Sequence, residues 1–197
     1  AVPGQAYDRL SGTSMAAPNL AGATALIRQY VKKNENNRFG LDGLSGTEKD
    51  VKVTALVNQL MMSTADIVYN KNGLPYAVRK QGAGLINIQS SVTTASYITT
   101  YENGTAMDKS KLELGDDKAK SGVYTATFDI TNISSSAVAY DVSHIIQTEG
   151  VSATYTSHGE TVVTQEGYLL SGSQISVTSV TGGGTGSGAR VTVNANS

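Results

Sequence analysis

The chain has 197 residues, of which 39% are hydrophobic and 16% charged, and a formal net charge of −1. This length allows one or two domains with a sizeable core. The near balance of charges excludes the strongly basic footprint of a nucleic-acid-binding protein. The absence of cysteine excludes disulfides and thiolate metal sites, and two histidines are too few for a dedicated zinc site. No run approaches the roughly 20 apolar residues that span a bilayer.

A helix is predicted from Ser14 to about Lys33. Its first turns carry small apolar residues on all sides, and a helix that is apolar all round is a buried one. The later turns gain basic residues, which suit a helix C-terminus and indicate that the helix emerges into solvent there.

A loop is predicted for residues 34–46, followed by a second helix. Thr47 with Asp50 three residues later is close to a capping box. Apolar residues at helical spacing then predict one core-facing stripe. Its members are Val53, Leu56, Val57, Leu60 and Met61.

Turn residues dominate the next segment. Asn72-Gly73 predicts a hairpin tip between residues 67–69 and 76–78. The glycines of residues 81–92 predict a tight backbone approach, and Asn87 is expected to cap a short helix.

After about Tyr97 the hydrophobic pattern changes to period two. Alternating stretches at 122–132, 137–147, 173–180 and 189–195 predict short strands, with 181–188 as a flexible glycine-rich loop. Several such strands separated by turn residues favour a β-sandwich. His144 is expected to lie half-buried on one strand, and His158 on the surface of a hairpin.

Ser14 is the strongest candidate for chemistry. A serine at a helix start is commonly only an N-cap. Here Gly12 permits a close backbone approach, Pro18 falls near the first turn, and the helix is expected to be buried. Such a helix directs partial positive charge at its N-terminus, so the Ser14 N–H is a candidate donor to an acyl-transfer oxyanion.

The heptad from Gly12 to Pro18, GTSMAAP, resembles the serine motif G-T-S-M-[A/S]-x-P of the subtilisin-like serine peptidases, or subtilases. The helix that follows and the segment from Arg79 to Val92 resemble, in order, later parts of the same catalytic domain. This resemblance implies that Ser14 is the nucleophile of a Ser-His-Asp triad. Gly12 and Thr13 join Ser14 as the substrate- and oxyanion-binding residues.

The rest of the triad is not found around Ser14. In subtilases the Asp and then the His precede the serine. The thirteen residues before Ser14 contain Asp8, outside the family's aspartate context, and no histidine. Asp8 is therefore interpreted as a turn residue. "SHGETVV" around His158 echoes the family's histidine motif, but only a circular permutation would place it in the triad. Because serine needs a base to become a nucleophile, the chain alone is predicted to be inert.

The resemblance implies a multi-domain chain cut from a longer secreted polypeptide. Residues 1–97 would be the C-terminal helical portion of an α/β subtilisin-like domain. Residues 98–197 would be an all-β fibronectin-III-like sandwich, as in cell-envelope proteinases of Gram-positive bacteria. That sandwich would continue past Ser197, which would leave an edge strand unpaired.

The implied parent is a secreted or cell-wall-associated serine endopeptidase that acts on protein or peptide substrates. The fragment's partner would be the rest of the catalytic domain, with neither nucleic acid nor a membrane span. No cofactor is expected in the fragment, although the resemblance allows calcium sites in the parent. Residues 114–122 are the segment most similar to a calcium-binding loop, and they are interpreted as a solvated turn.

Two other functions were weighed against the peptidase. A non-catalytic binding or spacer module would leave the serine region as a relic, which the intact motif disfavours. A serine hydrolase of another class would need a G-x-S-x-G elbow, and Ala16 stands where the second glycine belongs.

Overall fold

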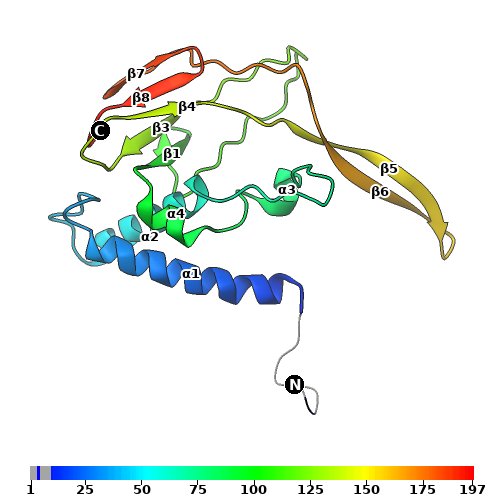
Figure 1. The fold of residues 1–197 in the computed structure, drawn as a ribbon, viewed down its shortest axis with the longest axis horizontal. Helices are drawn as coiled ribbons and strands as arrows, with labels where there is room; N and C mark the ends of the chain where they lie inside the picture. The colour runs from blue at the N-terminus through cyan, green and yellow to red at the C-terminus, as the bar shows by residue number, and fades with distance from the viewer. Residues whose placement is uncertain (1–3, 5–9) are drawn as a thin grey trace.

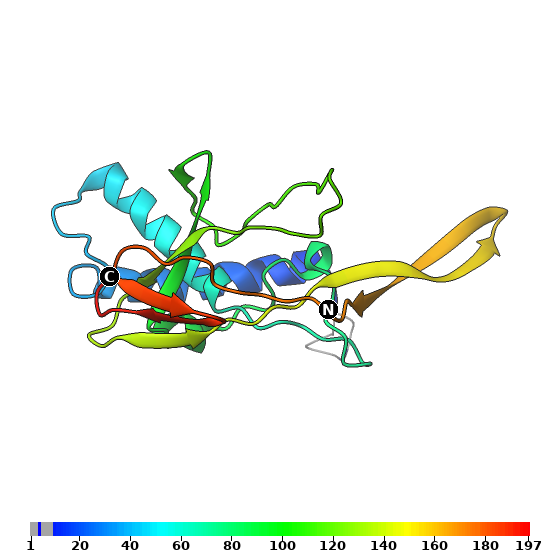
Figure 2. The same cartoon turned by 90° about the horizontal axis from the view of Figure 1, so that it is seen from above.

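The computed structural model describes residue 4 and residues 10–197. Figures 1 and 2 show an elongated arrangement in which helices α1, α2 and α4 lie beside small sheets and a long hairpin extends from one end. The described helices are α1 (Thr13–Lys33), α2 (Gly46–Ser63), α3 (Val78–Gln81) and α4 (Ile88–Thr93). The described strands are β1 (Ser96–Glu102), β2 (Thr105–Ala106), β3 (Phe128–Asn132), β4 (Val138–Asp141), β5 (Gln147–Ser157), β6 (Glu160–Leu169), β7 (Gly184–Ser187) and β8 (Arg190–Val193).

Helix α1 forms where the sequence predicts it, but its burial is the reverse of the prediction. Residues 11–22 are exposed, and the buried residues Ala23, Ile27 and Val31 lie in the second half. Exposed apolar side chains include Met15 at 41% and Leu20 at 48%. The physical reason is that an all-round apolar helix needs cover on every side, whereas α2 and α4 pack only against its second half.

The core of the chain lies between α1 and α2. The predicted stripe of α2 supplies four of its buried residues and meets two from α1; together with Leu41 they form one cluster. Its members are Ile27, Val31, Leu41, Val53, Leu56, Val57 and Leu60. Met61, the fifth predicted member of the stripe, is partly buried against this cluster. Because side chains at i, i+3, i+4 and i+7 share one helix face, the sequence spacing alone places this stripe.

The start of α2 differs from the predicted capping box. Ser45 is the N-cap residue, no side chain caps the helix, and the helix begins at Gly46, before Thr47. Asp50 is instead used across the helix interface, where its Oδ1 lies 2.8 Å from Arg28 Nη2 and 3.5 Å from Lys32 Nζ. The Asp50 carboxylate, which the sequence pattern assigned to the capping box, therefore forms ion pairs with Arg28 and Lys32 of α1 instead.

The predicted turn at Asn72-Gly73 is confirmed as a short hairpin of isolated bridges. Tyr69 pairs with Pro75, and Asp66 pairs with Leu85. The predicted close approach is confirmed at Gly84, which has φ +126° and whose added Cβ would lie 2.2 Å from the Asp66 carbonyl oxygen. Asn87 caps α4 as predicted, accepting a hydrogen bond of 2.9 Å from the Ser90 N–H.

The second half forms two three-stranded antiparallel sheets, in the orders β2-β1-β3 and β4-β8-β7. Asn132, which is buried, joins them by donating to the Val193 carbonyl at 3.2 Å. Several short strands are present, as expected, but the fibronectin-III-like sandwich is not confirmed by these sheets. Strand β1 also hydrogen-bonds to α2, because the Ile98 N–H donates to Ser63 Oγ at 3.0 Å.

Four predictions in this half need correction. Within 137–147, only residues 138–141 and Gln147 lie in strands. Residues 173–180 form no strand, and within 122–132 only the last five residues do. The glycine-rich segment predicted as a flexible loop contains β7, which pairs with β8. Its glycines permit close packing, since an added Cβ at Gly184 would lie 2.5 Å from the Thr192 carbonyl oxygen.

Strands β5 and β6 form a long hairpin, called the arm below, which comprises residues 147–169. The strands pair over ten registered positions and turn at His158 and Gly159, whose φ angles are +51° and +80°. Two left-handed residues match the twist of a two-residue hairpin turn. The expected surface position of His158 is confirmed. His144 is half-buried as expected, but it precedes β5 and lies in no strand.

The close approach at Gly84 predicts a large effect of substitution. Gly84→Ala should lower the free energy of unfolding by at least about 2 kcal/mol, since it combines a strained φ with a clash against backbone. Gly22→Ala is the matched control: it lies in α1 with nothing within 4 Å of an added Cβ, and should be neutral or stabilising. Urea unfolding of both variants measures the difference; equal midpoints would contradict the packing described at Gly84.

Candidate functional site

Ser14 is the second residue of α1, not its cap. Gly12 holds the N-cap position, and no side chain caps the helix. Both Met15 N and Ala16 N donate to the Gly12 carbonyl, at 3.0 and 3.1 Å. Gly12 has φ +149° and ψ +170°, a backbone region that is almost restricted to glycine. This sharp entry brings Thr13 and Ser14 directly to the end of the helix, where backbone N–H groups have no intrahelical acceptor.

Pro18 lies deeper in the helix than the sequence analysis expects. It is the sixth residue of α1, past the first turn. The amide that would donate to the Ser14 carbonyl four residues earlier is therefore missing. In a helix such a carbonyl is left without its normal partner and the ring crowds it. Ser14 therefore has an N–H in the first turn, where no intrahelical acceptor is available, and a carbonyl that lacks its usual donor four residues later.

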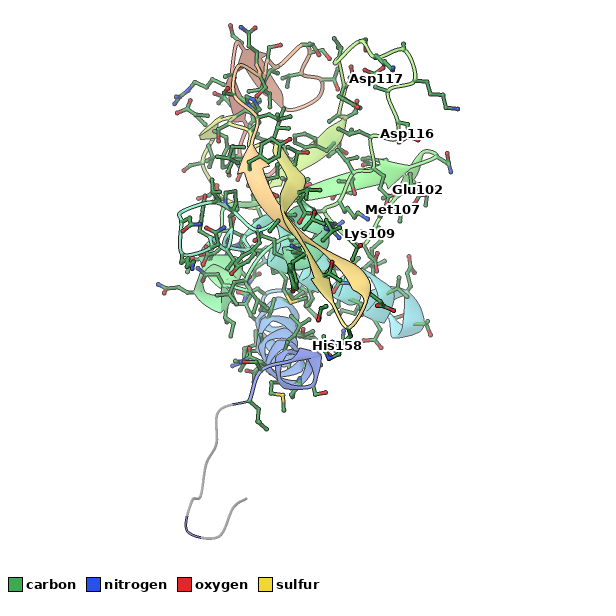
Figure 3. The ribbon with its side chains drawn as sticks, turned by 90° about the vertical axis from the view of Figure 1, so that its right-hand side faces the viewer. Glu102, Met107, Lys109, Asp116, Asp117 and His158 are labelled. Atoms are coloured by element: carbon green, nitrogen blue, oxygen red, sulfur yellow. The ribbon has the colours of Figure 1, made fainter. Side chains whose placement is uncertain are left out.

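The surroundings of Ser14 contain no base among the described residues. Ser14 is exposed, and no described hydrogen bond reaches its hydroxyl. His144 Nε2 lies 2.7 Å from Ser173 Oγ, and His158 Nδ1 lies 3.1 Å from Ser157 Oγ. In the view of Figure 3, His158 is drawn close to the N-terminal end of α1. Figure 1, which shows the molecule from the side, places the tip of the arm well away from that end. Neither histidine is therefore placed to accept the Ser14 proton.

Other candidate features lie away from Ser14 or outside the described residues. Asp8, interpreted as a turn residue, belongs to the undescribed range 5–9. Within the described part of the chain, no group of three His, Asp or Glu side chains could hold a metal ion. A shallow groove of about 330 Å³ is lined by residues of α2 and by Asp108, and Asp50 and Asp108 are the carboxylates in its lining. No described helix is long and apolar enough to cross a membrane.

A cluster of charges joins α3 to the base of the arm. The carboxylate of Glu149 on β5 pairs with Arg79, and its Oε1 lies 3.0 Å from Lys80 Nζ. The Glu149 side chain is 11% exposed. The hydrogen bond from Arg79, then that from Lys80, lower the pKa of Glu149 below its ordinary value. No local sequence pattern signals this cluster, because Glu149 lies 70 residues from Arg79 and 69 residues from Lys80 along the chain.

Comparison with known proteins assigns the first part of the chain. Residues 1–84 match the model of the subtilase family, peptidase family S8. These residues, less than half of the chain, are thus similar to the subtilase family. The resemblance predicted from the motif at Ser14 is thereby confirmed, including its likeness to large bacterial proteinases, whereas the fibronectin-III part is not confirmed.

Individual relatives extend this match. The PI-type proteinase of Lactococcus lactis subsp. cremoris is 31% identical over 159 residues, which are 77% of this chain and 8% of that protein. The PII-type proteinase of Lacticaseibacillus paracasei is 38% identical over 91 residues, 44% of this chain and 4% of that protein. The C5a peptidase of Streptococcus pyogenes is 28% identical over 98 residues. The chain spans less than a tenth of the length of these relatives.

The subtilase segment contains Gly12, Thr13 and Ser14, helices α1, α2 and α3, and the tight approach at Gly84. Arg79 and Lys80 also fall inside it, whereas Glu149 lies outside. The ion pairs at Glu149 therefore tie the subtilase segment to the arm.

Acid should weaken this attachment. Because the pKa of Glu149 is held below its ordinary 4.5, the ion pairs stabilise the folded state above that pH. The contribution should disappear as the pH falls through the lowered pKa. The protection of the amides at the base of β5, measured as hydrogen exchange relative to the intrinsic rate at each pH, should therefore fall in the wild type below about pH 4.5. In Glu149→Gln this protection should be low at every pH.

The matched control is Glu113→Gln, because Glu113 also has a lowered pKa but pairs only with the nearby Lys111. It should leave exchange in β5 unchanged at every pH. If wild type and Glu149→Gln showed the same exchange at pH 7, the ion pairs would not hold the arm.

Proposed function

We propose that this chain is part of a serine endopeptidase in which Ser14 is the nucleophile. The observation that carries the proposal is the position of Ser14 in the subtilase segment, at an exposed helix start with an unused N–H. The names of the relatives, which are proteinases or peptidases, support a peptidase parent. The substrate class is protein or peptide.

In the proposed reaction, the oxygen of Ser14 attacks the carbonyl carbon of the scissile peptide bond. A histidine from another part of the parent protein takes the Ser14 proton and passes it to the leaving amine. The Ser14 N–H, with the helix dipole behind it, donates to the oxyanion, and Gly12 and Thr13 line the same end of the helix. Water then hydrolyses the acyl-enzyme and restores the hydroxyl.

The residues before Ser14 indicate which triad members this chain would supply. Residues 1–13 include Asp8 and no histidine, and neither His144 nor His158 contacts Ser14. The catalytic Asp and His are therefore proposed to lie elsewhere in the parent, and the 197-residue chain alone to be inert. Any calcium bound by the parent would likewise lie outside these residues.

The domain division proposed is 1–97 for the catalytic portion and 98–197 for an appended β module. Strand β1 begins at Ser96, and its hydrogen bond from Ile98 to Ser63 attaches the second part firmly to α2. A secreted or cell-wall-associated location is proposed from the relatives. A spacer module with a relic serine region is the alternative, and the reactivity of Ser14 separates the two.

A fluorophosphonate, which labels only activated serines, tests the proposal. In the full-length protein, intact-mass and peptide analysis should find the adduct on Ser14. Ser14→Ala should abolish labelling and lower kcat by about a million-fold, as the loss of a triad member does. Ser11→Ala is the matched control, since Ser11 is also exposed near the helix start, and should label normally.

The 197-residue chain alone should give no adduct. An adduct there would show that the chain activates its own serine, and His144→Ala and His158→Ala would then identify the base. An unreactive Ser14 in the full-length protein would instead favour the spacer alternative.

A further inference from the structure

The arm is a sheet of two strands with no third. Within the described residues, β5 and β6 pair only with each other. Its base lies against the body near Pro75, but Figures 1 and 2 show no other segment beside its distal half. Tyr155 is 53% exposed and Val163 is 49% exposed, on opposite faces. A two-stranded hairpin is at best marginally stable alone in water, so an arm of this length gains from a further strand.

The two edges of the arm are not equivalent. Strand β5 has a register shift between Val151 and Ala153, which interrupts its ladder. Such a bulge is one of the devices that block edge-to-edge pairing. Strand β6 runs from Glu160 to Leu169 without a shift, and contains neither proline nor lysine, the residues that commonly protect an exposed edge. The outer edge of β6 is therefore the one open to a further strand.

The charge of the arm indicates what that strand carries. Residues 147–169 contain three glutamates and no lysine or arginine. Glu149 is paired with Arg79 and Lys80 at the base, which leaves Glu160 at the exposed tip of β6 with no ion pair among the described residues. A second copy of the arm would bring like charges together, which disfavours self-pairing. An incoming basic strand would meet opposite charge.

We propose that the outer edge of β6 binds an extended, basic polypeptide segment as an added strand, and that this segment belongs to the protein substrate. This proposal rests on the proposed peptidase function. In both Figure 1 and Figure 2 the arm extends beyond the end of α1 that carries Ser14. A long substrate held at the arm can therefore continue past that end. Main-chain hydrogen bonds supply affinity, and the exposed side chain of Val163 on β6 contacts a side chain of the added strand.

The ion pairs at the base orient this surface. Glu149 fixes β5 to Arg79 and Lys80 of α3, within the subtilase segment. These ion pairs therefore fix the orientation of the free edge of β6 relative to the subtilase segment, which contains Ser14. Binding at a preoriented edge costs less ordering than binding at a mobile one.

A binding measurement tests the proposal without catalysis. Full-length protein carrying Ser14→Ala is titrated against a fluorescent ten-residue peptide of alternating lysine and threonine, and anisotropy is recorded at low and physiological salt. The same peptide with alternate N-methylated residues cannot donate along one edge and should bind at least about tenfold more weakly. A peptide with glutamate in place of lysine should also bind more weakly.

Charge reversal on the protein gives the second test. Glu160→Lys lies at the exposed tip of the arm and should weaken binding of the basic peptide about threefold, more at low salt. Glu102→Lys is the matched control, since Glu102 is the exposed last residue of β1, and should have no effect. Equal binding of plain and N-methylated peptides, or equal loss in both variants, would overturn the proposal.

The outcomes also separate this inference from the peptidase proposal. Concentration-dependent self-association without peptide binding would overturn it in favour of a second copy. Peptide binding in a protein whose Ser14 fails to react with a fluorophosphonate would leave the strand-binding edge standing and remove its substrate role. A reactive Ser14 with no peptide binding would leave the peptidase standing and remove the edge.

Discussion

The packing of the second half of α1 against α2 is the contact on which the other features of this chain depend. Ile27 and Val31 meet the apolar stripe of α2, and Arg28 pairs with Asp50 beside them. Through α2, the same contact supports β1 and the sheets that follow. Because α1 is a single helix, anchoring its second half also fixes the direction of its first half. The position of Ser14 is thus set by a core that lies more than one helical turn away.

The first half of α1 has exposed apolar side chains and an open N-terminal end, and the proposed parent protein accounts for both. Its exposed apolar side chains, Met15 and Leu20 among them, belong to a surface that normally packs against other elements. Its start, with Gly12 at a glycine-restricted φ and Pro18 removing a helical donor, leaves the Ser14 N–H without an intrahelical acceptor and the Ser14 carbonyl without its usual donor. In the parent protein, a helix whose sides are covered by other elements but whose N-terminal end is open would present one serine to a catalytic base. The peptidase proposal supplies both the cover and the partner from the rest of the parent protein.

Local signals in the sequence predicted most of the helical half and the candidate nucleophile. Helix periodicity placed the stripe from Val53 to Leu60, the Asn87 cap follows from capping chemistry, and the motif at Ser14 identified the family. Predictions failed where a longer-range contact decided the structure. Asp50 pairs with Arg28 instead of capping α2. Part of the glycine-rich segment forms β7 because it hydrogen-bonds to β8. The Glu149 cluster joins segments that are distant in the sequence, so no local pattern signals it.

The central claim is that the face of α1 around Ser14 is left open by this chain and covered in the parent protein. Hydrogen exchange of α1 measures it most directly, by comparing the 197-residue chain with the full-length protein. The account predicts slow exchange from Ile27 to Lys33 in both, and exchange from Ala16 to Ala21 that is fast in the chain and slow in the full-length protein. Equal, strong protection of both halves in the 197-residue chain as a monomer would contradict it.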